Sequence, residues 1–367
     1  MVSITNMLTE QHDNNGIIPV AKPLLPTFDK VKSILQAIDN NRKYSNFGPV
    51  HNQLVVKYAD YFNVDESQIV LASNATMALI GLLEISHIKN WILPNFTFAA
   101  TGLAALASRK KLFLSDVCPD SFKIKNNFFP IEFNPDSFGI LPVAPFGGDF
   151  DFTEFEEFDH VIIDAAASIG SQKLLKEKIR YGWSIVFSLH ATKIFPAPEG
   201  AVVVCGNSGK AKEFRKWTSF GFDSNRSSVQ LGTNAKLSEV HSAYALASLI
   251  NREIEYAEWN SKLNIAKNSV KKQNQFIDFG SGIRPYWICK SPCAEDKIEL
   301  EMRLNRHKVG FRNWWERPLS SMPAFQDQDN VVVVSDYNAR VLSSTLTGLP
   351  MFRDLSDEQI RFIADIL

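Results

Sequence analysis

Short apolar runs alternate with helical patterns between residues 50 and about 205, and this alternation limits the fold more than any other feature of the chain. The runs predict seven strands, at 69–71, 91–93, 111–114, 140–143, 161–163, 185–187 and 201–204. Helical stretches lie between several of them, at 75–85 and 98–108. Strands that are apolar throughout and separated by helices predict a mostly parallel sheet covered on both faces, which is a three-layer α/β/α domain.

The pattern changes after residue 205. Helices are expected at 210–220, 236–273, 295–305 and 357–367, and the second is too long for one simple element, so it is bent or broken. At 367 residues the chain fits a large domain plus a smaller one. We therefore expect a large domain over residues 1–250, of which 1–16 are flexible, and a smaller C-terminal α+β domain over residues 251–367.

Charge and composition exclude several classes of protein. The formal net charge is −1, which gives no electrostatic reason to expect nucleic acid or an anionic membrane as a partner. Residues 1–16 lack a basic-then-apolar signal pattern, and no apolar stretch approaches the length of a membrane span, so a cytoplasmic location is expected. The four cysteines lack histidines at a spacing that completes a metal site. We expect them to be buried apolar residues and predict no metal.

Lys193 stands out among the polar residues because of its place and its neighbours. It ends the segment 188–193, which follows one predicted strand, while Asp164 follows another. Ligands of such sheets gather beyond the carboxyl ends of the strands. Apolar residues on both sides, from Phe187 to Phe195, would desolvate the amine and make it nucleophilic toward an aldehyde. The alternative is a solvated loop lysine.

Two further groups complete a recognisable set. Asp164 follows three aliphatic residues and precedes three alanines, so a buried carboxylate there needs a partner such as a protonated ring nitrogen. Ala75 and Thr76 begin a helix whose free N–H groups, with the Thr76 hydroxyl, would bind a phosphate. Both features have a simpler interpretation as helix caps. Together with the lysine they are the protein groups that pyridoxal 5′-phosphate (PLP) requires.

Other residues near these segments have two interpretations each. Ser188 offers a second hydroxyl beside the lysine. Phe98 follows a strand and either stacks on a flat heterocycle or belongs to the core. Asn234 either caps the next helix or reaches a phosphate. A hydrolase triad of Ser188, His190 and Asp164 is rejected, because the serine lacks the Gly-x-Ser-x-Gly turn and lies too close to the histidine. The sequence also lacks the glycine-rich loops that bind the phosphates of nucleotides or a dinucleotide.

In order along the chain, these segments resemble the nucleotide-sugar aminotransferases of the DegT/StrS type. The resemblance covers nearly the whole chain and rests on several ordered motifs, at 19–23, 45–49, 73–76, 94–98, 164–166, 188–193, 199–200, 232–234, 349–350 and 355–360. It implies the aspartate aminotransferase fold (PLP transferase fold type I), PLP or its amino form PMP as cofactor, and a homodimer with shared active sites.

The resemblance also implies roles for single residues. Lys193 would form the Schiff base and move protons, and Asp164 would hold the pyridinium. Thr76, the N–H of Ala75 and Ser188 would bind the phosphate, and Phe98 would stack on the ring. Asn234 would reach the phosphate from the neighbouring subunit. The substrate contacts expected in the same site are His190, Arg312, Trp314 and Trp315, although the two tryptophans and Arg312 are equally explained by packing between domains.

Three departures from the family pattern stand in this chain. Ala167 replaces the usual Gln or His, which removes a hydrogen bond to the ring hydroxyl, and Ser168 is the expected substitute. Lys236 stands where an arginine is common, and the two side chains are not interchangeable. Ala201 replaces a glycine after Glu199-Gly200.

The implied reaction moves an amino group from glutamate to a keto-sugar linked to dTDP or UDP, a 6-deoxy sugar aminated at C4 rather than C3. Such reactions belong to deoxyamino sugar synthesis for O-antigen, capsule or antibiotics. A related branch removes a sugar hydroxyl with PMP and has histidine in place of the lysine, so Lys193 favours transamination. The remaining alternative is a PLP-binding protein without turnover, with a regulatory or structural role.

Overall fold

The computed structural model describes residues 16–130, 134–171, 173–174 and 178–367. Residues 1–15, most of the segment expected to be flexible, lie outside these ranges. The strands are β1 (Ile69–Ala72), β2 (Asn90–Pro94), β3 (Lys111–Ser115), β4 (Phe138–Ile140), β5 (Ile162–Asp164), β6 (Ser184–Ser188), β7 (Ala201–Cys205), β8 (Trp287–Lys290), β9 (Val331–Val333) and β10 (Leu346–Leu349). The α-helices are α2 (Phe28–Asn41), α3 (Pro49–Phe62), α4 (Ala75–Ile85), α5 (Ala99–Ala107), α7 (Ser208–Trp217), α8 (Glu239–Ile250), α9 (Arg252–Ser269), α10 (Ala294–Arg306), α11 (Tyr337–Thr345) and α12 (Asp357–Ile366).

The seven strands expected from the sequence correspond to β1 to β7, although the fourth, expected at 140–143, shares only Ile140 with β4. Together they form one twisted layer. Two hydrogen-bonded groups form it, with the orders β1-β7-β6-β5 and β4-β2-β3-β9. Parallel bridges from Ile140 to Val161 and from Val143 to Asp164 connect the two groups. Only the pairs that β7 makes with β1 and β6 are antiparallel among these described strands. The expected mostly parallel sheet is confirmed, and β9 extends it beside β3.

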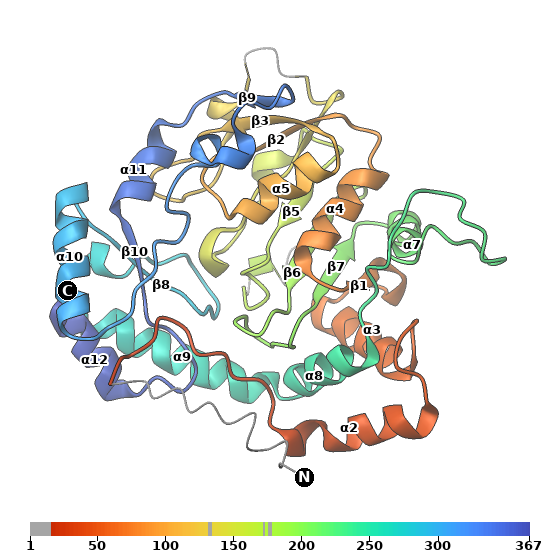
Figure 1. Ribbon diagram of the computed structural model, residues 1–367, viewed down its shortest axis with the longest axis horizontal. Helices are drawn as coiled ribbons and strands as arrows, with labels where there is room; N and C mark the ends of the chain where they lie inside the picture. Colours follow the sequence, from red (N-terminus) through yellow and green to blue (C-terminus); the bar gives the residue numbers. More distant parts are fainter. Residues whose placement is uncertain (1–15, 131–133, 172, 175–177) are drawn as a thin grey trace, which may run out of the picture.

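Successive residues of the strands face opposite sides, as the period of two requires. Val70 and Val203 pack with α4, α5 and α7 in one hydrophobic cluster, while Leu71 and Val202 pack with α3 and α8 in another. Figure 1 shows α4 and α5 on one face of the sheet, with α8 on the other side of the molecule. The three-layer α/β/α architecture is therefore confirmed.

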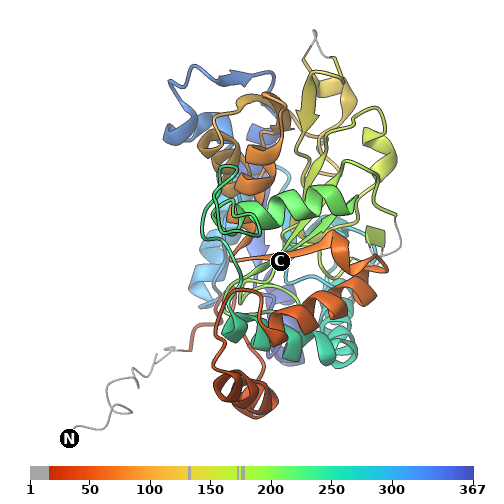
Figure 2. The ribbon, with the colours of Figure 1, turned by 90° about the vertical axis from the view of Figure 1, so that its right-hand side faces the viewer.

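The helical stretch expected at 236–273 is broken at Asn251, where α8 ends and α9 begins. Figure 1 shows these two helices end to end, with α10 and α12 gathered at the far end of α9. Strands β8 and β10 form a separate antiparallel pair in this C-terminal region, which agrees with its expected α+β character. Helix α2 was not expected from the sequence and lies on the outside of the molecule, against α8 (Figure 2). The domain boundary near residue 250 stays a prediction.

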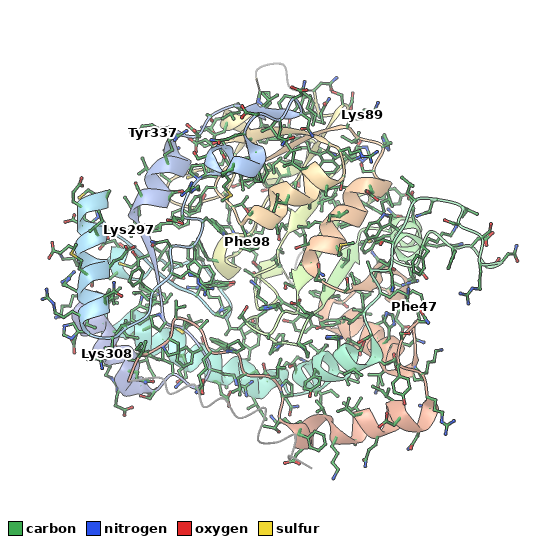
Figure 3. All side chains as sticks on the ribbon, in the orientation of Figure 1. Phe47, Lys89, Phe98, Lys297, Lys308 and Tyr337 are labelled. Atoms are coloured by element: carbon green, nitrogen blue, oxygen red, sulfur yellow. The ribbon has the colours of Figure 1, made fainter. Side chains whose placement is uncertain are left out.

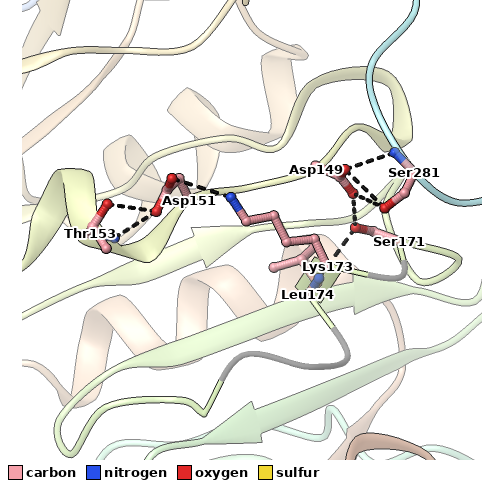
Figure 4. A network of polar contacts seen from close by, with 7 residues as sticks. All are labelled: Asp149, Asp151, Thr153, Ser171, Lys173, Leu174 and Ser281. Atoms are coloured by element: carbon pink, nitrogen blue, oxygen red, sulfur yellow. Dashed lines mark hydrogen bonds and ion pairs between the residues drawn. The ribbon is translucent and has the colours of Figure 1, made fainter.

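A polar network joins the segments before and after β5 to each other and to the C-terminal region (Figure 4). Asp149 accepts hydrogen bonds from Ser171 Oγ at 2.8 Å and from the N–H of Ser281 at 2.8 Å. Nearby, Lys173 Nζ lies 3.2 Å from a carboxylate oxygen of Asp151. Residues 281–286 are thereby held beside residues 167–171, at the end of the sheet where Asp164 lies.

No helix within the described residues is both long and apolar enough to cross a membrane.

Candidate active site

A cavity of about 670 Å³ lies beyond the carboxyl ends of β5 and β6 and beside the N-terminus of α4. This volume is within the range of small-molecule sites. All but two of the site residues expected from the sequence line it, namely Ala75, Thr76, Phe98, Asp164, Ser188, His190, Lys193, Arg312, Trp314 and Trp315. Residues from the sheet, from two helix starts and from the C-terminal region thus meet at one site.

Lys193 projects into this cavity from the loop that follows β6. The loop is turned back by a hydrogen bond from the Lys193 N–H to the His190 carbonyl at 2.8 Å. Lys193 Nζ donates to the Tyr286 hydroxyl at 2.7 Å and lies 5.4 Å from the centre of the Tyr286 ring. The amine is therefore held by one partner from a distant part of the chain, in a position open to a ligand.

Asp164 ends β5 and is 6% exposed. One carboxylate oxygen accepts from Thr101 Oγ1 at 2.8 Å, and the other accepts from the N–H of Ala166 at 3.1 Å. Burial raises the pKa of the Asp164 carboxyl, and these two donors and the charge of Lys193 act in the opposite direction. Among the described residues, no arginine or lysine forms an ion pair with it. The carboxylate suits a cationic group of a ligand.

The helix-cap alternative for Asp164 is not found, because residues 165–170 form turns and no helix begins there. At the start of α4 the capping residue is Asn74, whose side chain accepts from the Met77 N–H at 2.9 Å. The N–H groups of Ala75 and Thr76 have no acceptor among the described residues, and both residues line the cavity. A helix start with free N–H groups is a suitable phosphate site, and Ser188 lies in the same cavity.

Phe98 is the residue before α5, and it lines the cavity while remaining 60% exposed. Figure 3 labels it in the central part of the molecule. Phe98 is therefore not a buried core residue. An exposed ring at a cavity wall is available to stack on a flat heterocycle.

The expected substrate contacts form the remaining wall. His190 Nδ1 lies 2.9 Å from Thr192 Oγ1, and its Nε2 lies 3.7 Å from a carboxylate oxygen of Glu199. The Arg312 guanidinium lies 4.8 Å from the centre of the Trp314 ring. Trp315 also stacks on Phe146, with ring centres 4.3 Å apart, so the tryptophans line the cavity and pack against the core at once.

Two expected residues do not line the cavity. The Ser168 hydroxyl is buried and donates to the Ala144 carbonyl at 3.3 Å, so it faces away from the site. Asn234 is exposed and accepts from Lys236 Nζ at 2.6 Å. Asn234 was expected to act from a neighbouring subunit, and that role stays a prediction.

Several residues of the site were missed at the level of sequence. Thr97 and Thr101 lie 3.0 Å apart through their hydroxyls, and Thr101 contacts Asp164. Their spacing of four positions at a helix start was the available signal. Tyr286 is 93 positions from Lys193, and no local pattern connects the two. Glu199 was noticed only as part of a family motif.

The residues present fit PLP. The cavity contains an amine, an unpaired buried carboxylate, free helix N–H groups and an exposed aromatic ring, which match the aldehyde, ring nitrogen, phosphate and ring face of the cofactor. In the described part of the chain, no cluster of three or more His, Cys, Asp or Glu residues is placed to hold a metal ion.

Comparisons with known proteins give the family and the fold type of the chain. Residues 29–367 match the model of the DegT/DnrJ/EryC1/StrS aminotransferase family. A dTDP-4-amino-4,6-dideoxy-D-glucose transaminase of Shigella dysenteriae is 26% identical, over 95% of this chain and 97% of that protein. A solved putative PLP-dependent aminotransferase of Bacillus cereus superimposes with a TM-score of 0.87 at 20% identity, covering 95% of this chain and 99% of that one. DesI, solved with its TDP-sugar product, gives a TM-score of 0.83 at 22% identity, over 95% and 92% of the two chains.

The expected fold type and the expected family are both confirmed by these matches, since the family model spans all but the first 28 residues and the structural neighbours cover nearly the whole chain. The chain belongs to the DegT/DnrJ/EryC1/StrS aminotransferase family.

Proposed function

We propose that this protein transfers an amino group from glutamate to the keto-sugar of a nucleoside diphosphate, a dTDP- or UDP-linked 6-deoxy sugar, at C4 rather than C3. The observation that carries the proposal is the cavity that holds Lys193, Asp164 and the start of α4 together. A relative that is named a dTDP-4-amino-4,6-dideoxy-D-glucose transaminase supports the choice of sugar class.

The expected enzyme and cofactor class, a PLP-dependent aminotransferase, is confirmed by the family match and by the solved neighbours. When bound, PLP supplies the aldehyde that takes up an amino group and the ring that accepts electrons as a bond at the amino carbon breaks.

Lys193 and Asp164 would divide the work of this chain between them. Lys193 Nζ would hold the aldehyde of the cofactor in the resting enzyme and, as a free amine, would move a proton at the carbon that bears the amino group. The carboxylate of Asp164 holds a proton on the ring nitrogen, because its burial makes a lone negative charge unfavourable and a cationic partner favourable.

The rest of the cavity orients and shields the ligand. The N–H groups of Ala75 and Thr76 and the Ser188 hydroxyl would hold the phosphate, and Phe98, which lines the same cavity, would stack on the ring. Arg312, Trp314 and Trp315 form a cationic and aromatic wall that is suited to a phosphorylated sugar. A homodimer in which Asn234 reaches the partner's phosphate site and a cytoplasmic location are further parts of the proposal.

The proposal is tested by incubating the PLP-loaded protein with glutamate and a panel of nucleotide sugars. The panel contains dTDP- and UDP-linked 4-keto-6-deoxy and 3-keto-6-deoxy sugars. We expect 2-oxoglutarate and an amino sugar to form with a 4-keto substrate. Consumption of a sugar hydroxyl without amine transfer would favour a dehydratase, and cofactor binding with no turnover on any substrate would favour a silent binding protein.

A further inference from the structure

Among the described residues that line the cavity, only Tyr286 forms a hydrogen bond with Lys193 Nζ. No role toward the cofactor or the substrate has yet been given to Tyr286. It precedes β8 in the C-terminal region, and its hydroxyl accepts from Nζ at 2.7 Å. Because the amine donates in this contact, the phenolic hydrogen remains free to donate elsewhere. None of the described residues accepts that hydrogen.

The Tyr286 ring is held firmly in place. It is 9% exposed and lies edge-on to Trp314 and to Phe146, with ring centres 5.4 Å and 5.8 Å away. The backbone before it is fixed by the hydrogen bond from the Ile283 N–H to the Gly170 carbonyl at 3.2 Å and by the Asp149 network, and the backbone after it is fixed by the pairing of β8 with β10. The hydroxyl therefore has little freedom to leave Lys193.

Ala167 lies on the same wall of the cavity as Tyr286. Both pack in one hydrophobic cluster. A carbon added at Gly147 would lie 2.7 Å from Arg284 Cβ and 2.9 Å from the Ala167 carbonyl oxygen, which shows how closely the two segments approach. Ala167 has no polar group, and the Ser168 hydroxyl is directed to the Ala144 carbonyl. On this wall the Tyr286 hydroxyl is thus a side-chain donor that lines the cavity beside Lys193.

PLP itself presents a matching acceptor. Its ring hydroxyl is attached to the carbon next to the one that carries the aldehyde, so it lies beside whatever nitrogen binds that aldehyde. A group in contact with Lys193 Nζ is therefore adjacent to the ring hydroxyl. This step rests on the proposed function, since it takes Lys193 as the residue that binds PLP.

We propose that Tyr286 is a cofactor-contacting residue whose hydroxyl donates a hydrogen bond to the ring oxygen of PLP, beside Lys193. This hydrogen bond replaces one that neither Ala167 nor Ser168 can make. A hydrogen bond donated to the ring oxygen makes that oxygen a weaker acceptor for the proton that it shares with the lysine nitrogen. The pKa of this shared proton is therefore lower when Tyr286 is present.

The test is a pH titration of the visible absorbance of the PLP-loaded protein without any substrate. In Tyr286→Phe the ring packing is retained and only the hydroxyl is lost. We expect the midpoint of the spectral change to rise by about one to two pH units, the effect of one hydrogen bond to a charged group. Retention of cofactor on dialysis should fall about tenfold or more for the same reason.

Two further variants make the result specific. Ala167→Gln in the Tyr286→Phe background places an amide donor on the same wall, and we expect it to return the midpoint toward the wild-type value. Tyr61→Phe is the matched control, because the Tyr61 hydroxyl bonds the Ile169 carbonyl at 2.7 Å and does not line the cavity. It should leave the midpoint unchanged.

The outcomes separate this inference from the proposed function. If wild-type protein shows no lysine-bound cofactor at all, the proposed function fails. If wild-type protein binds PLP and Tyr286→Phe has the wild-type midpoint and cofactor retention, the role of Tyr286 is refuted while the proposed function stands. An equal midpoint shift in Tyr61→Phe would also refute it, because the effect would then be structural.

Discussion

Two threonine hydroxyls lie next to the buried carboxylate of Asp164. They provide this carboxylate with a side-chain hydrogen-bond donor. Thr97 and Thr101 are 1% and 0% exposed, and their hydroxyls form a chain that ends on Asp164. Because Thr101 holds the carboxylate in its charged form, it helps Asp164 to bind a cationic ring nitrogen.

Thr101→Val removes this donor while keeping the shape of the side chain. We expect the pKa of the Asp164 carboxyl to rise further and the affinity for PLP to fall about tenfold, the effect of losing one hydrogen bond to a charged group. The dissociation constant is measured by the quenching of tryptophan fluorescence on addition of PLP. Thr101→Ser retains the hydroxyl and serves as the control. Wild-type affinity in Thr101→Val would show that the threonine has no part in the site.

For single residues, the sequence predicted those whose role can be recognised from their neighbours in the chain. Lys193, Asp164 and the start of α4 each follow a strand or open a helix, and parallel strands bring such positions to one edge of a sheet. Tyr286 has no such local context, because it reaches Lys193 only through packing of the C-terminal region. Ser168 sits next to the departure at Ala167, but the turn after β5 directs its hydroxyl to Ala144.

At the scale of elements, the N-terminus of α3 is capped by a residue from α8. The carboxylate of Glu239 accepts from the N–H groups of Val50 and His51 at 2.9 and 2.8 Å, and Glu239 is 1% exposed. Gly48 leaves room for this approach, since an added carbon would lie 2.5 Å from Glu239 Cδ. A negative charge at a helix start is favourable, and this one is shielded from water.

Glu239→Ala should therefore destabilise the protein by about 2–3 kcal/mol, because two buried N–H groups lose a charged acceptor. The measurement is the free energy of unfolding from urea denaturation. Asp65→Ala, which removes an exposed cap of the short helix at Glu66–Gln68, is the control and should have a much smaller effect. An equal loss in the two variants would contradict the role of burial at Glu239.

Helix α9 contains a buried carboxyl that makes the stability of the fold depend on pH. Glu255 of α9 pairs with Arg353 at 3.1 Å, and the charges of Lys30 and Glu258 also act on its carboxyl. Burial raises the pKa of Glu255 to about 7 from an ordinary 4.5. The folded chain therefore binds this proton more tightly than the unfolded chain. The stability that this proton binding contributes is complete below pH 4.5 and is lost as the pH rises through 7.

Glu255→Gln should remove this pH dependence. Between about pH 5 and about pH 8, the stability of the wild type should fall relative to that of the variant by up to about 3 kcal/mol. Unfolding free energies measured across this range give the difference directly. Parallel curves for the two proteins would mean that Glu255 keeps its ordinary pKa in the folded state.

On the scale of the whole molecule, the alternation of strands and helices predicted the sheet and its two helical layers, because each strand is apolar on both faces. Strand β9 was missed because it is a short, half-exposed run whose partner β3 lies more than 200 positions earlier. Helix α2 was missed although Val31, Ile34, Leu35 and Ile38 stand at helical spacing, so the apolar pattern was present in the sequence and was overlooked.

Chemical trapping shows whether Lys193 is the residue that binds the cofactor. PLP-loaded protein is reduced with borohydride, digested, and mapped by mass spectrometry, with Lys193→Ala treated in the same way. We expect one phosphopyridoxyl adduct, on the peptide that contains Lys193, and none in the variant. An adduct on a different lysine, or an equal adduct in Lys193→Ala, would contradict it.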